Sequence, residues 1–187
     1  MLLHYATDQP DSTLAVRRVA LKVFCGAAVR ILADSQESAN EDHLTRLPNR
    51  RIGEAQLADR CSVRRAGRFS LVIADVDDLK LINDRSYMAG DAALYELAML
   101  LADVAHDKGG MAYRWGGDEF CLILPVEREQ ADDTVTTVQD VGVRFSFGSA
   151  SFPDEADSES ELWSVAERRL KAQKGDRKAG REFQARP

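Results

Sequence analysis

The stretch Trp115-Gly116-Gly117-Asp118-Glu119-Phe120 joins two short apolar segments and decides how the middle of the chain folds. Residues 111–114 precede it and residues 120–124 follow it. Apolar segments joined by a glycine-containing turn indicate a β-hairpin. Adjacent glycines accept positive φ and let a bulky anion approach the backbone. Acids beside them are suited to a divalent cation that binds nucleotide phosphates, and the alternative is a solvated Gly-Gly-Asp turn.

A second group of acids follows a strand that lies earlier in the chain. Residues 69–77 are almost continuously apolar and rich in branched side chains, which indicates a central strand buried on both faces. It ends in Asp75, Asp77 and Asp78, of which Asp75 and Asp77 share one face because side chains alternate along a strand. Acids in this position suit metal ligands, and the alternative is a solvated strand end.

The remaining pattern predicts an α+β fold of the α/β-sandwich kind. Expected helices cover residues 50–61, 79–84, 92–105 and 161–174, with a short helix or loop at 127–140 and a late strand at 143–150. This order is that of a ferredoxin-like or palm-like, antiparallel-rich sheet with helices packed on it, expected on one face. Such a sheet brings the end of the first strand beside the hairpin, so that Asp75 and Asp118 share one metal.

The sequence places the domain at residues 41–175, and the segments at the two ends of the chain are expected to lie outside it. Residues 1–40 predict an N-terminal helix, with apolar positions such as Leu14, Leu21 and Ala28 spaced by seven. The spacing fits a short coiled-coil seam for dimerisation and signalling, or an ordinary amphipathic helix packed on its own domain. Residues 176–187 are basic and are expected to form a mobile tail.

Composition excludes several classes of protein. The 187 residues are 44% hydrophobic and 30% charged, with a net charge of −6, which suits a soluble globular protein rather than a nucleic-acid or anionic-membrane binder. The three cysteines are far apart and form no zinc or disulfide pattern, which indicates a reducing cytoplasm. No apolar segment is long enough to span a membrane, and no signal peptide is expected.

Four blocks, in order along the chain, together resemble the GGDEF family, the diguanylate cyclases. They are Asp42-His43-Leu44-Thr45-Arg46-Leu47-Pro48-Asn49-Arg50-Arg51, Asp75-Val76-Asp77-Asp78-Leu79-Lys80-Leu81-Ile82-Asn83-Asp84, Arg114-Trp115-Gly116-Gly117-Asp118-Glu119-Phe120 and Val143-Arg144-Phe145-Ser146-Phe147-Gly148. The resemblance implies a bacterial signalling enzyme that condenses two GTP molecules into cyclic di-GMP and pyrophosphate. It also implies a homodimer, since each subunit holds one GTP, and Mg²⁺ or Mn²⁺, with two ions per half-site.

The resemblance implies a role for each of several residues. Asp75, Asp118 and the Val76 carbonyl would hold the first ion, while Glu119 would bind the second ion or take the 3′-hydroxyl proton, so that Asp118 and Glu119 are the catalytic pair. The residues expected to contact the nucleotide are Asn83 and Asp91 at the guanine edge, Lys80, Arg114 and Lys174 at the phosphates, and Gly116 and Gly117 in the turn.

The sequence also departs from the family pattern. Arg46 replaces the usual Gly, Leu79 the usual Phe, and Tyr87-Met88 lie near the place of the usual Gly-His. The segment from Asn83 to Asp91 is one residue short, and the connection from Phe120 to Ser146 is trimmed. Asp107-Lys108-Gly109-Gly110 replaces the RxxD product-inhibition site, so none is expected. The alternative function is a weak or inactive domain that binds GTP as a regulatory module, or a cyclase with altered base choice.

Overall fold

The computed structural model describes residues 39–62 and 67–184, and the predicted N-terminal helix lies outside them. The chain divides into two compact units, Met1–Ala39 and Asn40–Pro187. The described elements of the second unit, in chain order, are α2 (Arg50–Ser62), β1 (Phe69–Val76), α3 (Leu79–Arg85), α4 (Tyr87–Asp107), β2 (Met111–Gly116), β3 (Glu119–Leu124), α5 (Arg128–Gln139), β4 (Phe145–Phe152) and α6 (Glu159–Gln184).

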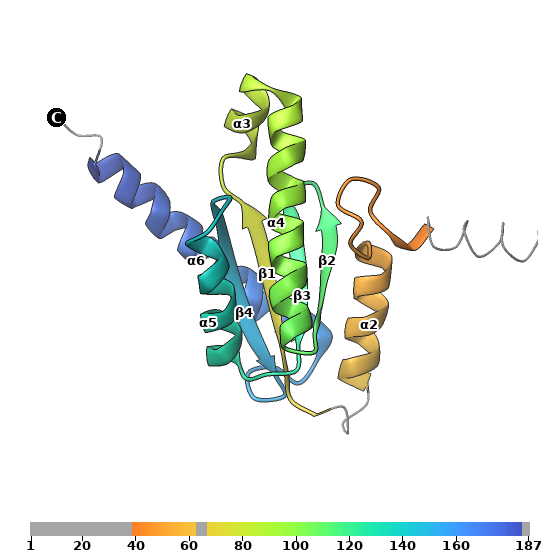
Figure 1. The fold of residues 1–187 in the computed structure, drawn as a ribbon. Helices are drawn as coiled ribbons and strands as arrows, with labels where there is room; N and C mark the ends of the chain where they lie inside the picture. Colours follow the sequence, from red (N-terminus) through yellow and green to blue (C-terminus); the bar gives the residue numbers. More distant parts are fainter. Residues whose placement is uncertain (1–38, 63–66, 185–187) are drawn as a thin grey trace, which may run out of the picture. The chain divides into compact units, whose positions relative to one another are not determined.

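One four-stranded sheet with the order β2-β3-β1-β4 forms the centre of this unit (Figure 1). Every pair of neighbouring strands is antiparallel. All eight residues of β1 are buried, as expected for a central strand with two paired edges and two covered faces. The antiparallel sheet of the predicted α+β fold is confirmed, with the β-α-β-β-α-β order of a ferredoxin-like domain.

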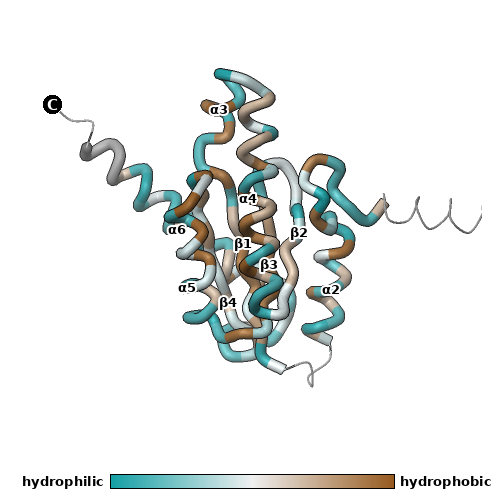
Figure 2. Tube along the Cα trace, viewed as in Figure 1, coloured by the Kyte–Doolittle hydropathy of each residue, from teal (hydrophilic) through white to brown (hydrophobic). Residues whose placement is uncertain are grey.

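Helices cover both faces of the sheet, whereas the sequence predicted helices on one face. Alternate residues of β1 belong to two separate apolar clusters. Val72 packs with α4 and α5 residues on one face, and Leu71 packs with α2 and α6 residues on the other. Figure 2 shows apolar residues along β1 and β3, in the middle of the sheet. A strand that is apolar at nearly every position requires this arrangement, because its side chains point to both faces.

Two helices, α4 and α6, extend several residues beyond their predicted bounds. α4 begins at Tyr87, before the Gly90-Asp91 pair that the sequence placed ahead of the helix. α6 runs to Gln184, although the sequence predicted its end at Lys174 and a mobile tail from residue 176. Arg177 explains part of this difference, because it bonds to Asp77 and to the Phe145 carbonyl. Among the described residues, no helix is both long enough and apolar enough to cross a membrane.

The loop before α2 is built by a side-chain-stabilised turn. Asp42 Oδ1 accepts hydrogen bonds from the backbone and the hydroxyl of Thr45, both at 2.8 Å. Arg46 then takes φ 62°, a left-handed conformation that costs a non-glycine residue about 1 kcal/mol. This φ accounts for the Gly that the family usually has there. Asn49 caps α2, since Asn49 Oδ1 accepts from Ile52 N at 3.4 Å.

Candidate active site

The end of β1 and the turn between β2 and β3 meet at one end of the sheet. Asp75 pairs with Glu119 in the β1–β3 register, and Val76 N donates to the Asp118 carbonyl at 3.1 Å. Gly116 ends β2 with φ 154°, and Gly117, with φ 54°, forms the turn between the strands together with Asp118. The two groups of acids that lie far apart in the sequence are therefore neighbours in space, as the predicted strand order requires.

A cavity of about 390 Å³ opens at this place, and it is lined by acids and cations in equal number. Its lining comprises Asp75, Val76, Asp77, Asp78, Leu79, Lys80, Asp118, Lys174, Arg177 and Lys178. Two of the predicted phosphate contacts, Lys80 and Lys174, thus share one hollow with Asp75 and Asp118. A cavity of mixed charge suits a ligand that is itself a complex of cation and polyanion, such as a metal-bound nucleoside triphosphate.

The surroundings of Asp75 disfavour its ionised, negatively charged form. Burial raises its pKa, the charges of Asp118 and Asp77 raise it further, and Lys174 lowers it. Asp75 Oδ1 is shielded from solvent and accepts no well-aligned hydrogen bond, although Lys174 Nζ lies 2.6 Å away. Burial also raises the pKa of Glu119, and Asp75 and Asp118 add to that shift. Crowded carboxylates of this kind gain most from a cation placed among them.

The donor set fits Mg²⁺ at this point. Within the described residues, no three His, Cys, Asp or Glu side chains surround one point closely enough to hold an ion by themselves. Mg²⁺ takes only one or two carboxylates from a protein and completes its octahedron with water and substrate phosphate. Asp75 Oδ1, which is shielded from solvent and paired with Lys174, matches that need together with the neighbouring Asp118.

Arg114 lies beneath the turn rather than on the cavity. Its guanidinium is buried, donates to the Gly117 carbonyl and lies over the ring of Phe120 at 5.0 Å from the centroid. The charges of Asp42, Asp118 and Asp91 counter the lowering of its pKa by burial. Arg114 thus supports the turn and connects it electrostatically with the first motif. Sequence reasoning missed Asp42 as part of this arrangement, although its spacing from Thr45 was the available signal.

The shortened segment from Asn83 to Asp91 keeps the Asn83 side chain against Gly90. A Cβ built on Gly90 would lie 1.7 Å from Asn83 Oδ1, so the Asn83 amide occupies the space that Gly90 leaves free. Asp91 follows directly and is exposed near the start of α4. Asn83 therefore lies against Gly90, the residue that directly precedes Asp91, despite the missing residue.

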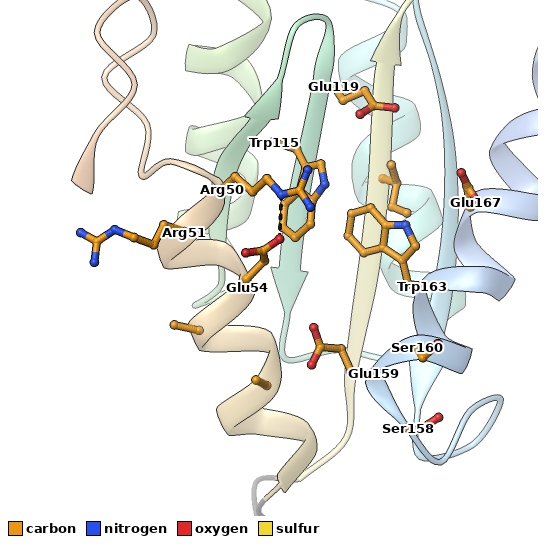
Figure 3. A pocket seen from close by; sticks show the side chains of 13 residues that line it. Arg50, Arg51, Glu54, Trp115, Glu119, Ser158, Glu159, Ser160, Trp163 and Glu167 are labelled. Atoms are coloured by element: carbon orange, nitrogen blue, oxygen red, sulfur yellow. Dashed lines mark hydrogen bonds and ion pairs between the residues drawn. The ribbon is translucent and has the colours of Figure 1, made fainter. Parts of the chain in front are cut away.

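A second, larger cleft of about 1050 Å³ lies on the other face of the sheet, between α2 and α6. Trp115 and Trp163 stack there with centroids 4.3 Å apart, and Arg50 lies over Trp115 (Figure 3). Glu119 lines this cleft, and Figure 3 shows it at the upper end of the indole pair. The two carboxylates of the predicted catalytic pair, Asp118 and Glu119, thus line different hollows, as expected for neighbouring residues at a strand end.

Comparison with known proteins assigns the family. The family model of the diguanylate cyclase GGDEF domain matches residues 39–180. The chain is 39% identical over 99 residues to the probable diguanylate cyclase DgcE of Escherichia coli, covering 51% of this chain and 9% of that protein. It is 31% identical over 148 residues to the diguanylate cyclase TpbB of Pseudomonas aeruginosa, covering 70% and 34% respectively.

A solved structure shows the same fold. The coiled coil and GGDEF domain of DgcB from Caulobacter crescentus, in complex with c-di-GMP, matches with a TM-score of 0.80 at 21% identity, over 88% of this chain and 95% of that one. The chain spans only about a tenth to a third of the two curated relatives. Since the family model nevertheless covers most of the chain, from residue 39 to residue 180, this protein belongs to the diguanylate cyclase GGDEF domain family.

Proposed function

We propose that this protein is a diguanylate cyclase that condenses two GTP molecules into cyclic di-GMP and releases two pyrophosphates. The observation that carries the proposal is the shared cavity, in which Asp75 and Asp118 meet Lys80 and Lys174. In each of two equivalent steps, the 3′-hydroxyl oxygen of one GTP forms a bond to the α-phosphorus of the other. The bond from that phosphorus to the pyrophosphate oxygen breaks, and the hydroxyl proton passes to a base.

Each residue of the site has a task in this reaction. Mg²⁺ or Mn²⁺ held by Asp75, Asp118 and the Val76 carbonyl would neutralise phosphate charge, with a second ion at Glu119. Lys80 and Lys174 meet the phosphates, and the raised pKa of Glu119 makes that carboxylate a better acceptor for the hydroxyl proton. In-line attack between two bound nucleotides requires two domains to face each other, so the active form is a homodimer.

The guanine base is read by Asn83 and Asp91. A carboxylate accepts hydrogen bonds from guanine N1–H and the exocyclic amine, which adenine does not offer in that arrangement. A site whose groups hydrogen-bond one base discriminates against a base that leaves those groups unpaired. The adjacency of Asn83 and Gly90 in the structure favours an intact base pocket over the alternative of an inactive GTP-binding module.

The proposal is tested by chromatography of the products formed with Mg²⁺ from GTP, from ATP and from a mixture of both. Cyclic di-GMP from GTP alone is the expected result, and Asp118→Ala or Glu119→Ala should abolish it without unfolding the domain, because the turn is partly exposed. GTP binding without product, at high enzyme concentration, would establish the regulatory module instead. Mixed or adenine products would show altered base choice.

Replacing Gly90 with Ala is expected to weaken GTP binding by about 10-fold, since the added methyl group occupies the space of the Asn83 amide. The fold should not suffer, because the displaced atoms end a flexible side chain and Ala is the better helix former. The measurement is KM for GTP alongside Tm. Gly90→Ala, Asn83→Ala and the double variant should have the same KM. If the effects of the two substitutions on KM added up in the double variant, Gly90 would not act through Asn83.

Product inhibition at an RxxD site is not expected. Asp107 and Lys108 stand near that position without the Arg and Asp pair. Cyclic di-GMP bound beside the hairpin, and lost in Asp107→Ala or Lys108→Ala, would contradict this part of the proposal.

A further inference from the structure

Asp77 lies two residues after Asp75, just beyond the end of β1, and both of its carboxylate oxygens have protein partners. Ser146 Oγ donates to Asp77 Oδ1 at 2.7 Å, and Arg177 Nη1 lies 2.7 Å from Asp77 Oδ2. The Asp77 backbone N–H also donates to the Arg144 carbonyl at 3.0 Å. The Asp77 carboxylate therefore has protein partners on both of its oxygens, from β4 and from α6, whereas the only polar contact of Asp75 Oδ1 among the described residues is with Lys174. Two acids that look equivalent in the sequence have different structural environments.

Arg177 completes a link between the end of β1, the start of β4 and the second half of α6. The same Nη1 that meets Asp77 also donates to the Phe145 carbonyl at 2.7 Å. The Asp77 side chain is 9% exposed and that of Arg177 is 32% exposed. A charge pair that is largely shielded from water and supported by further hydrogen bonds holds its geometry better than an exposed pair.

The position of this link along α6 gives it a function. Among the described α6 residues, the apolar core contacts end at Leu170, one turn before Lys174. Beyond Leu170 the helix is held by polar contacts. Gln173 Oε1 accepts from Phe147 N at 2.7 Å, Lys174 pairs with Asp75, and Arg177 follows one turn later. Lys174 and Lys178, one turn before and one residue after Arg177, both line the cavity of the proposed site. Without Arg177, the segment that carries both lysines is attached at one end only.

We propose that Arg177, anchored on Asp77, is a positioning residue that holds Lys174 and Lys178 of α6 over the nucleotide cavity. Asp77 is on this account an anchor for α6 and not a ligand of the catalytic ion. The proposal rests on the proposed function for the meaning of the cavity, but the link itself is measurable without catalysis.

The chain offers a matched control on the same helix. Arg169 lies eight residues before Arg177 and makes the same kind of link, donating to the Ser149 carbonyl of β4 at 2.7 Å and pairing with Glu155 at 2.6 Å. Arg169 does not line the cavity. Arg169→Ala therefore removes a comparable α6–β4 link without touching the segment that carries the two lysines.

The first measurement is amide hydrogen exchange of the whole protein, which needs no turnover. Arg177→Ala should speed exchange across residues 171–179, whereas Arg177→Lys should restore part of the protection and Arg169→Ala should leave that segment unchanged. Unchanged exchange in Arg177→Ala would overturn the proposal, and so would equal loosening in Arg169→Ala. This readout distinguishes a failed link from a failed proposed function, because it does not depend on GTP.

The second measurement separates positioning from general stability. Arg177→Ala should raise KM for GTP about 10-fold, and Arg177→Lys should recover part of it, while Arg169→Ala lowers Tm without changing KM. Because Arg177 acts through the lysines, adding Arg177→Ala to Lys174→Ala should increase KM by less than it does in the unmodified protein. The proposal would be overturned if the KM increases of Arg177→Ala and Lys174→Ala multiplied in the double variant. A raised KM in Arg169→Ala would overturn it as well.

Discussion

Asp75→Asn should lower turnover by about 10³-fold and, at neutral pH, raise Tm. Turnover falls because the metal–phosphate cavity loses a buried anionic ligand. Tm rises because burial and the neighbouring carboxylates disfavour ionised Asp75 in the folded protein, as its raised pKa shows. Asn keeps the shape of the side chain, and Lys174, which is 40% exposed, can be hydrated when its partner is lost. The paired measurement is kcat with Mg²⁺ and GTP, and Tm without ligand.

The stability gain of Asp75→Asn should depend on pH in a stated direction. A carboxyl group whose pKa is raised by folding stabilises the fold while it is protonated, and this contribution is lost as pH rises through the folded pKa. The difference in Tm between Asp75→Asn and the unmodified protein should therefore be largest near pH 7.5 and shrink in acid. A lower Tm for Asp75→Asn than for the unmodified protein at pH 7.5 would show that the folded protein stabilises the negative charge of Asp75. Activity retained above a tenth of the original would contradict its role as a ligand.

Gly148→Ala should destabilise the domain by about 3 kcal/mol, and lower Tm by about 10 °C, because α6 crosses β4 at this residue with backbone against backbone. A Cβ at this position would lie 2.2 Å from both the Ala166 carbonyl oxygen and the Leu170 nitrogen. Backbone atoms within a helix cannot shift aside as the end of a flexible side chain can. The whole of α6 must therefore move away from the sheet. Thermal unfolding monitored by circular dichroism measures the effect.

The control for Gly148→Ala is Gly175→Ala, farther along α6, where the added Cβ meets no atom within 4 Å. Gly175→Ala should raise Tm slightly, since Ala is the better helix former. If Gly148→Ala unfolded at the same temperature as the unmodified protein, the close approach of α6 to β4 would be wrong. Lys174 would then lose the packing that brings its helix to the cavity.

The sequence predicted the strands well because their signals are local and strong. Residues 69–77 are apolar at nearly every position, and two adjacent glycines mark the turn of the hairpin. These two signals were enough to predict β1, β2 and β3. The strand order then brought Asp75 to Asp118. The same apolar run contained the evidence for helices on both faces, since a strand buried on both sides needs two cores. The prediction of helices on one face did not apply that inference.

The parts that the sequence did not predict depend on contacts between distant segments. The continuation of α6 through Arg177 is supported by a pair with Asp77, a hundred residues earlier, and helix periodicity carries no information about such a pair. Gly90 was expected to lie ahead of the helix at residues 92–105, whereas it lies within α4 and its lack of a side chain makes room for Asn83. Arg114 was expected to meet phosphates, and only the structure shows it buried against the Gly117 carbonyl.

The most direct measurement of the central claim is the position of Mn²⁺ in crystals grown with a GTP analogue whose α-phosphorus cannot be attacked. Anomalous scattering locates the ion without reference to activity. The expected peak lies between the carboxylates of Asp75 and Asp118, in contact with the nucleotide phosphates and with Lys174 turned from Asp75 toward those phosphates. An ion bound away from both carboxylates, with the nucleotide outside this cavity, would contradict the account.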